Sequence, residues 1–138
     1  STKKEVIESA LKKMKIPRGL SRKILEDVLI QREELMSTAV GHGIAFPHPR
    51  NPIISEIEDE SISICFLEKP VDYGALDNEA VYILFIIISS NSKRHLEILS
   101  KLSFLCRNED FLSMLRFQPS METVLEHVKR TEKEWKAR

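Results

Sequence analysis

The feature that most constrains this fold is a continuous apolar run at residues 80–88. The run is rich in β-branched and aromatic residues, which favour strands, and it lacks the alternation of a strand with one face in water. It is also far shorter than the roughly 20 residues that a membrane-spanning helix needs. We therefore expect a strand buried on both faces of a sheet, which requires helices on both sides.

Helices are predicted before and after this strand. Capping residues mark where they begin: Thr2 with Glu5, then Ser21, then Asn91 or Ser92. A short helix is expected at residues 108–117, and a last one from residue 119. The expected apolar stripes are Val6, Ala10, Leu11 and Met14; Ile24, Leu25, Val28, Leu29 and Leu35; Leu96, Leu99, Leu102 and Leu105; and Val124, Leu125 and Val128.

Two further segments are predicted to join the sheet. Residues 38–46 have the pattern of a strand, a turn and a strand, and residues 61–67 that of another strand. Residues 51–60 and 70–78 are rich in acidic and turn-forming residues and are expected to be loops. We predict an α/β fold: a single domain over residues 1–138, with a mixed, mostly buried β-sheet flanked by helices on both faces.

Composition excludes several classes of function. The 138 residues carry 21 Lys and Arg against 21 Asp and Glu, so the formal net charge is zero. This balance argues against a general nucleic-acid or anionic-membrane surface. No basic-then-apolar signal opens the chain. Cys65 and Cys106 both follow apolar residues, which favours buried thiols in a reducing cytosol, and we predict a cytoplasmic location.

One short segment has residue types suited to chemistry. Gly41 and Gly43 precede Pro47 and Pro49, which flank His48. The two prolines restrict the backbone around the histidine, so its imidazole should leave a rigid loop. The glycines allow a positive φ, and their amide groups could face an anion. A neutral imidazole is a nucleophile near neutral pH, so His48 is the predicted nucleophile.

Other residues could support a phosphoryl group on this histidine. Phosphoryl transfer asks mainly for positioning and positive charge, and Arg32 and Arg50 are the nearest arginines in the sequence. Ser37 and Thr38 could supply hydroxyl groups. His95 is expected in the first turn of the helix that follows the buried strand, where ligands of α/β sheets collect.

A structural role is the alternative for each of these residues. The glycine segment could be a tight loop that feeds a buried strand, with His48 as a hydrogen-bonded core histidine. His95 could be an ordinary surface or capping residue. Arg32 could pair with Glu33 or Asp27 on its own helix.

The run Gly41-His42-Gly43-Ile44-Ala45-Phe46-Pro47-His48 resembles the signature of the fructose/mannitol-type IIA domains of the bacterial sugar phosphotransferase system, including the nitrogen-regulatory branch. Residues 92–102, with the pattern His-Leu-x-x-Leu-x-x-Leu, resemble the segment that holds the family's second active-site histidine. The resemblance extends from Lys4 to about Val128. It implies a phosphorylated His48, with His95 beside it and Arg32 in contact with the site.

The resemblance also implies partners. A phosphorylated histidine carrier protein is the expected donor, and a IIB domain or a regulatory target protein is the expected acceptor. The chemistry needs no metal, nucleotide or other cofactor. Family members usually begin with an extra strand and turn, so we expect that residues 1–138 are cut from a longer protein, in which a DNA-binding segment could precede them.

Three functions remain open at this point. A Pro-His-Pro-Arg ending resembles the nitrogen-regulatory branch, so a phosphocarrier of that type is our main prediction. A sugar-uptake IIA component that passes phosphate to a IIB domain is the alternative. A metal-dependent hydrolase using His42, His48 and His95 ranks last, because no His-x-x-x-His or His-Glu-x-x-His spacing is present.

A docking surface is predicted around His48. Ile44, Phe46 and Leu96 should form its apolar patch, with Lys93 and Arg94 as a charged rim. His42 is expected to fill a loop and His127 to lie on the surface.

Overall fold

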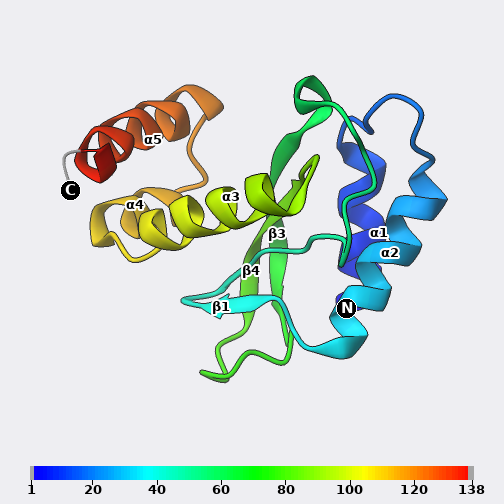
Figure 1. The fold of residues 1–138 in the computed structure, drawn as a ribbon. Helices are drawn as coiled ribbons and strands as arrows, with labels where there is room; N and C mark the ends of the chain where they lie inside the picture. The colour runs from blue at the N-terminus through cyan, green and yellow to red at the C-terminus, as the bar shows by residue number, and fades with distance from the viewer. Residues whose placement is uncertain (1, 137–138) are drawn as a thin grey trace. The chain divides into compact units, whose positions relative to one another are not determined.

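The computed structural model describes residues 2–136, which fall into two compact units that divide between His95 and Leu96. The first unit contains α1 (Lys3–Lys13), α2 (Arg22–Leu35), β1 (Ala39–Gly41), β2 (Ile44–Ala45), a 3₁₀ turn (Ile57–Asp59), β3 (Ser61–Val71) and β4 (Val81–Ile88). α3 (Ser92–Leu105) begins in the first unit and continues into the second, which also holds α4 (Glu109–Leu115) and α5 (Met121–Lys136). Figure 1 shows these elements.

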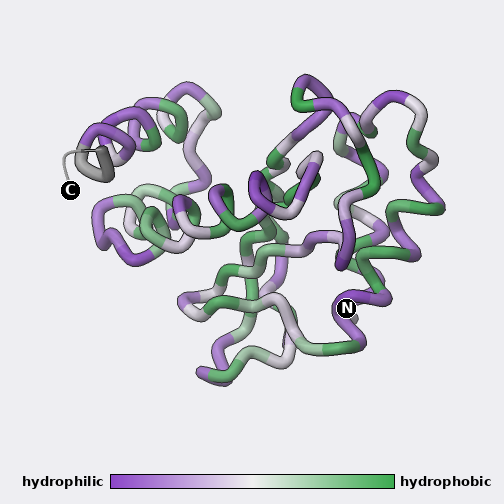
Figure 2. Tube along the Cα trace, in the orientation of Figure 1, coloured by the Kyte–Doolittle hydropathy of each residue, from purple (hydrophilic) through white to green (hydrophobic). Residues whose placement is uncertain are grey.

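α1 and α2 begin at the predicted caps and cover one face of the sheet. Thr2 and Glu5 form the capping box, and the Ser21 hydroxyl accepts from the Ile24 amide. Hydrophilic and hydrophobic segments alternate along both helices (Figure 2), as amphipathic helices require. The buried positions include Ile7, Leu11, Leu25 and Leu29, which join β3 and β4 residues in one core.

The predicted stripe of α2 is wrong at both of its ends. Ile24 is 54% exposed and Leu35 is 61% exposed, whereas Leu25 and Leu29 are fully buried. Ile24 is in the first turn of α2 and Leu35 is its last residue. The core therefore covers the middle of the helix and leaves these two end positions in solvent.

The four strands form a mixed sheet in the order β1-β2-β4-β3. β2 pairs with β4 in parallel, and β3 pairs with β4 antiparallel. Along β4, Leu84 and Ile86 belong to the core with α1 and α2, and the alternating residues Ile83, Phe85 and Ile87 are 0–1% exposed as well. The prediction of a strand buried on both faces, in an α/β fold, is confirmed.

The strand predicted at residues 61–67 is longer than expected. β3 continues through Pro70 to Val71, so the loop prediction for residues 70–78 fails at its start. Proline is tolerated here because the register shifts between Phe66 and Val71, so no ladder position requires the missing amide of Pro70.

The glycines of the motif form the turn between β1 and β2. Gly41, His42 and Gly43 all have positive φ, at 96°, 57° and 78°. A Cβ on Gly43 would lie 2.3 Å from the Tyr82 ring, so this position has room only for glycine. The His42 amide donates to Asp77 at 3.1 Å, which ties the turn to the loop before β4.

The second unit packs its helices around their own apolar residues. Asn108 caps α4, and its side chain accepts from the Phe111 amide. The buried residues include Leu102, Leu105, Phe111, Leu115 and Val124. Two predictions fail here: Leu125 is 50% exposed, and His127 is half-buried with its ring 6.4 Å from that of Phe111. Leu96, predicted both in the apolar stripe and in the docking patch, is 65% exposed.

Candidate functional site

His48 is held by the loop that follows β2. The Phe46 amide donates to the Thr38 carbonyl at 3.0 Å, and the Ile87 amide of β4 donates to the Pro47 carbonyl at 2.9 Å. The half-buried imidazole lies between two buried prolines. Its Nδ1 lies 2.7 Å from the Phe46 carbonyl oxygen. A carbonyl can only accept, so Nδ1 carries the proton and Nε2 has the free lone pair.

His95 lies directly beside His48. It is in the first turns of α3, which Asn91 caps by accepting from the Arg94 amide at 2.9 Å. The two imidazole centroids are 4.6 Å apart, with the ring planes tilted by 46°. The Ser89 hydroxyl, at the end of β4, lies 3.0 Å from His95 Nδ1. The fold therefore brings together the two histidines that the sequence separates by a strand and a loop.

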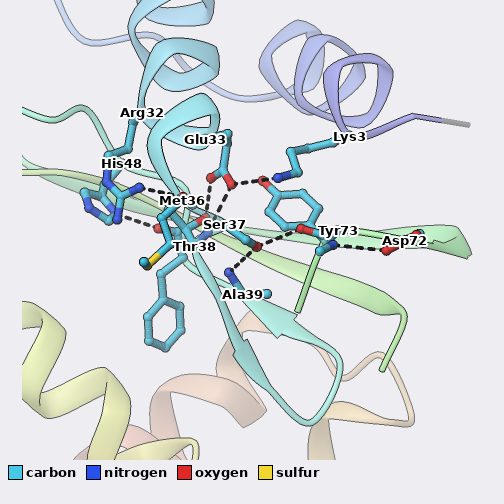
Figure 3. Close-up of polar contacts among 12 residues, drawn as sticks. Lys3, Arg32, Glu33, Met36, Ser37, Thr38, Ala39, His48, Asp72 and Tyr73 are labelled. Carbon is cyan, nitrogen blue, oxygen red and sulfur yellow. Dashed lines mark hydrogen bonds and ion pairs between the residues drawn. The ribbon is translucent and has the colours of Figure 1, made fainter. Parts of the chain in front are cut away.

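Arg32 supplies positive charge at the same place. Its Nη1 donates to the Met36 carbonyl at 2.6 Å, which anchors the guanidinium at the C-terminal end of α2. Figure 3 shows its side chain extending toward His48. It does not pair with Glu33 or Asp27, the alternative considered from the sequence. One of its five donors is used by the backbone, so others can face an anion.

Burial and positive charge keep both histidines neutral. Burial lowers the pKa of His48, and the Arg32 charge lowers it further, although the bond to the Phe46 carbonyl opposes this. Burial also lowers the pKa of His95, and His48 and Arg32 act in the same direction. An uncharged imidazole is the form that can act as a nucleophile.

A buried carboxylate shapes the chain between α2 and β1. Glu33 is 6% exposed and accepts from both the amide and the hydroxyl of Thr38, while Lys3 lies 3.5 Å from it (Figure 3). The neighbouring Tyr73 is fully buried, and burial, followed by the Glu33 charge, raises the pKa of its hydroxyl. This cluster fixes how the end of α2, which carries Arg32, joins the sheet.

Four of the other predicted phosphate-supporting residues have a local structural role. The Thr38 hydroxyl donates to Glu33, and the Ser37 hydroxyl donates to the Tyr73 carbonyl at 2.7 Å. Gly41 and Gly43 are needed for the turn described above. Arg50 is exposed in the loop beyond His48.

The predicted docking patch is wrong for its central members. Ile44 and Phe46 are 0% and 2% exposed, and the Phe46 ring lies edge-on to that of Phe85 with the centroids 5.7 Å apart. They offer no surface to a partner. Lys93 is exposed, and Leu96 is exposed within the second unit.

Arg94 is engaged by a carboxylate. Its Nε and Nη2 donate to Glu60 at 3.1 and 2.9 Å, and Ser90 donates to the same carboxylate through its amide and hydroxyl. These partners lower the pKa of Glu60 against the opposing effect of burial. The pair ties the start of α3 to the start of β3, so the charge of Arg94 is largely compensated.

Two features of the site were not predicted from the sequence. Ser89 contacts His95, and it follows the apolar run as one of two similar serines, so no pattern distinguished it. Met36 is 70% exposed next to the Arg32 guanidinium, and its place after an amphipathic helix could have indicated an exposed position.

Within residues 2–136, no three His, Cys, Asp or Glu side chains gather into a set that could hold a metal ion. None of the helices in this part of the chain combines the length and apolar character needed to cross a membrane.

Comparison with known proteins places the chain in a family. Residues 1–131 match the family described as phosphoenolpyruvate-dependent sugar phosphotransferase system, EIIA 2. The chain belongs to this family of phosphotransferase components, in agreement with the resemblance seen in the sequence.

Relatives come from two branches. A nitrogen regulatory protein of Pseudomonas aeruginosa is 32% identical over 131 residues, which cover 92% of this chain and 82% of the relative. The mannitol-specific phosphotransferase enzyme IIA component of Bacillus subtilis is 30% identical over 125 residues, which cover 91% of this chain and 85% of the relative.

Solved structures agree on the fold. The nitrogen regulatory protein IIA-Ntr of Neisseria meningitidis has a TM-score of 0.74 at 28% identity, covering 93% of this chain and 87% of that one. Enzyme IIA-mannitol of Escherichia coli, in its complex with phosphorylated enzyme IIB-mannitol, has a TM-score of 0.69 at 20% identity. The likeness covers 94% of this chain and 88% of that one. The second likeness concerns the fold alone.

Proposed function

We propose that this chain is a histidine phosphocarrier in which His48 accepts a phosphoryl group on Nε2. The observation that carries the proposal is the 2.7 Å contact between His48 Nδ1 and the Phe46 carbonyl oxygen. A ring that donates from Nδ1 presents its lone pair at Nε2. A second imidazole and an arginine lie beside it. Membership of the EIIA 2 family supports the same chemistry.

The transfer forms one bond and breaks one. The Nε2 lone pair of His48 forms a bond to the phosphorus of a phosphorylated histidine carrier protein. The P–N bond of the donor breaks, and its electron pair stays on the donor's ring nitrogen. The His48 ring then carries a proton on Nδ1 and phosphorus on Nε2, so it gains positive charge, which the Phe46 carbonyl oxygen stabilises.

Arg32 and His95 stabilise the phosphoryl group in this proposal. A loose transition state spreads negative charge over three oxygens, so fixed donors around them are the main requirement. The Arg32 guanidinium is anchored through Met36 and has further donors available. A neutral His95 can donate one N–H without repelling a developing positive charge on His48.

We assign the chain to the nitrogen-regulatory branch, in the cytoplasm, with a regulatory protein as the target of its phosphorylation state. The 32% identical nitrogen regulatory protein and the IIA-Ntr structure support this branch, as does the sequence Pro47-His48-Pro49-Arg50. The 30% identical mannitol component favours the second candidate, a sugar-uptake role in which a IIB domain takes the phosphoryl group.

The test is incubation with phosphoenolpyruvate and the general phosphorelay proteins, followed by intact mass measurement. We expect one phosphoryl group on the wild type and none on His48→Ala, with an adduct that is labile in acid and stable in base. Stoichiometric phosphorylation of His48→Ala would remove His48 as the acceptor. Adding a mannitol or fructose IIB domain then separates the branches, because rapid loss of phosphate to IIB supports sugar uptake.

The matched control is His42→Asn. This variant removes an exposed imidazole close to the site in sequence, and asparagine tolerates the positive φ of 57° at that position. It should be phosphorylated like the wild type. A circular dichroism spectrum identical to that of the wild type shows that His48→Ala has kept its fold.

A further inference from the structure

The Ser89 hydroxyl is a buried polar group that the proposed transfer does not yet use. Ser89 is 6% exposed at the end of β4, and its Oγ lies 3.0 Å from His95 Nδ1. Within the described part of the chain, this ring nitrogen is the only hydrogen-bond partner of the Ser89 side chain. The neighbouring Ser90 hydroxyl is bonded to Glu60 instead, at 2.7 Å.

The direction of this hydrogen bond determines which nitrogen of His95 carries a proton. If Nδ1 donated to Ser89, the buried hydroxyl hydrogen would have no acceptor, and an unmade hydrogen bond in a buried place is destabilising. If the hydroxyl donates to Nδ1, both groups are satisfied. The second arrangement places the ring proton on Nε2.

We propose that Ser89 is a positioning residue that holds His95 in its Nε2–H tautomer. This inference rests on the proposed function of His48. His48 is held in the opposite tautomer, with its proton on Nδ1, by the Phe46 carbonyl. The two rings, 4.6 Å apart, are thereby assigned different tasks. His48 presents a lone pair to phosphorus, and His95 presents an N–H to the phosphoryl oxygens.

The direct test is long-range ¹H–¹⁵N spectroscopy of the histidine rings in the unphosphorylated protein, above the pKa of both groups. We expect nitrogen shifts of the Nε2–H form for His95 and of the Nδ1–H form for His48. In Ser89→Ala, His95 should move to averaged shifts, because Nδ1 loses its fixed donor. Ser89→Thr keeps a hydroxyl and should keep the wild-type shifts.

The kinetic test is the rate of phosphoryl transfer to His48. Losing one positioning hydrogen bond of about 1 kcal/mol predicts about a fivefold slower reaction in Ser89→Ala. Ser89→Thr should restore the wild-type rate. Ser90→Ala is the matched control, because it removes the adjacent hydroxyl, which serves Glu60, and it should leave the His95 shifts unchanged.

Two results would overturn the inference: an Nδ1–H form of His95 in the wild type, or a Ser89→Ala variant with unchanged shifts and unchanged rate. The ring-nitrogen shifts in both results are measured without phosphate, so they do not depend on the proposed function; only the rate does. Failure of the wild type to become phosphorylated would instead reject the phosphocarrier role, and the spectra would still decide the tautomer.

Discussion

His48 and His95 show how neighbours set the state of a single side chain. Burial is the largest influence on both, and it disfavours the imidazolium. The charge of Arg32 acts in the same direction on each ring. If Arg32 holds the phosphoryl group as proposed, the same charge also favours an uncharged His48 before the group arrives.

The lowered pKa values predict how folding stability depends on pH. Both lie below the ordinary value of 6.5, so the unfolded chain takes up protons at a higher pH than the folded one. The two neutral imidazoles therefore contribute to the free energy of unfolding in full above about pH 6.5, and this contribution is lost as the pH falls through their pKa values in the folded protein. Urea unfolding across this range should show a smaller loss on acidification in His48→Ala and His95→Ala. An unchanged pH slope in both variants would contradict this.

Arg32→Lys should slow phosphoryl transfer by roughly 10–1,000-fold, the range for losing a donor to developing charge. An ammonium group keeps the charge but cannot bond the Met36 carbonyl and a phosphate oxygen through one rigid fork. Rapid-quench measurement of transfer gives the rate. Arg22→Lys is the control, because Arg22 also donates to a carbonyl, that of Leu11, and it should transfer at the wild-type rate. A wild-type rate in Arg32→Lys would remove this residue from the site.

At the scale of elements, the site lies at the end of α2, the start of α3 and the short connections between strands. The β1–β2 turn, the loop from β2 to His48 and the junction of β4 with α3 place the functional groups. Each connection is tied to a neighbour: the turn to Asp77, the loop to Ile87 and the junction to Glu60. A distortion of any one of these connections should therefore displace the His48 side chain.

Gly43→Ala tests the turn. Alanine would be strained at a φ of 78° and would place its Cβ 2.3 Å from the Tyr82 ring. We expect a loss of about 2–4 kcal/mol in unfolding free energy, from about 1 kcal/mol of backbone strain plus overpacking. Gly19→Ala is the matched control, since its φ of 74° is similar and its Cβ would meet open space, so it should lose only about 1 kcal/mol. Equal losses in the two variants, measured by urea unfolding, would show that the contact with Tyr82 is unimportant.

Most elements could be predicted from the sequence because they follow local patterns. The apolar run became β4, and the caps at Thr2 and Ser21 began helices as expected. The end of β3 could not be predicted, because whether a strand tolerates Pro70 depends on the register of its partner strand.

At the scale of the whole molecule, the sequence could not show which residues far apart in the chain contact one another. Glu60 and Arg94 are 34 residues apart, so nothing local showed that the charge of Arg94 is compensated. Phe46 appeared suitable for docking because it precedes the active loop, yet the sheet buries it against Phe85. His48 and His95 were predicted from their residue patterns and from the family resemblance, and their closeness follows from the pairing of β2 with β4.

A chain with no formal net charge should respond strongly to a charge placed at its active loop. The phosphorylated histidine carrier protein, the proposed donor, brings its own phosphate to His48. His48→Asp should therefore bind this donor at least about 10-fold more weakly than His48→Ala, because like charges in an interface repel. Titration calorimetry with both variants provides the comparison. Equal affinities would mean that charge at His48 does not control docking.

The central claim is that Nε2 of His48 accepts the phosphoryl group, and one spectrum tests it most directly. The protein is labelled with ¹⁵N in its histidine rings, phosphorylated through the phosphoenolpyruvate relay, and examined for coupling between phosphorus and ring nitrogen. We predict coupling to Nε2 of His48, with the proton retained on Nδ1 beside the Phe46 carbonyl. Coupling to Nδ1 of His48, or to either nitrogen of His95, would contradict the account.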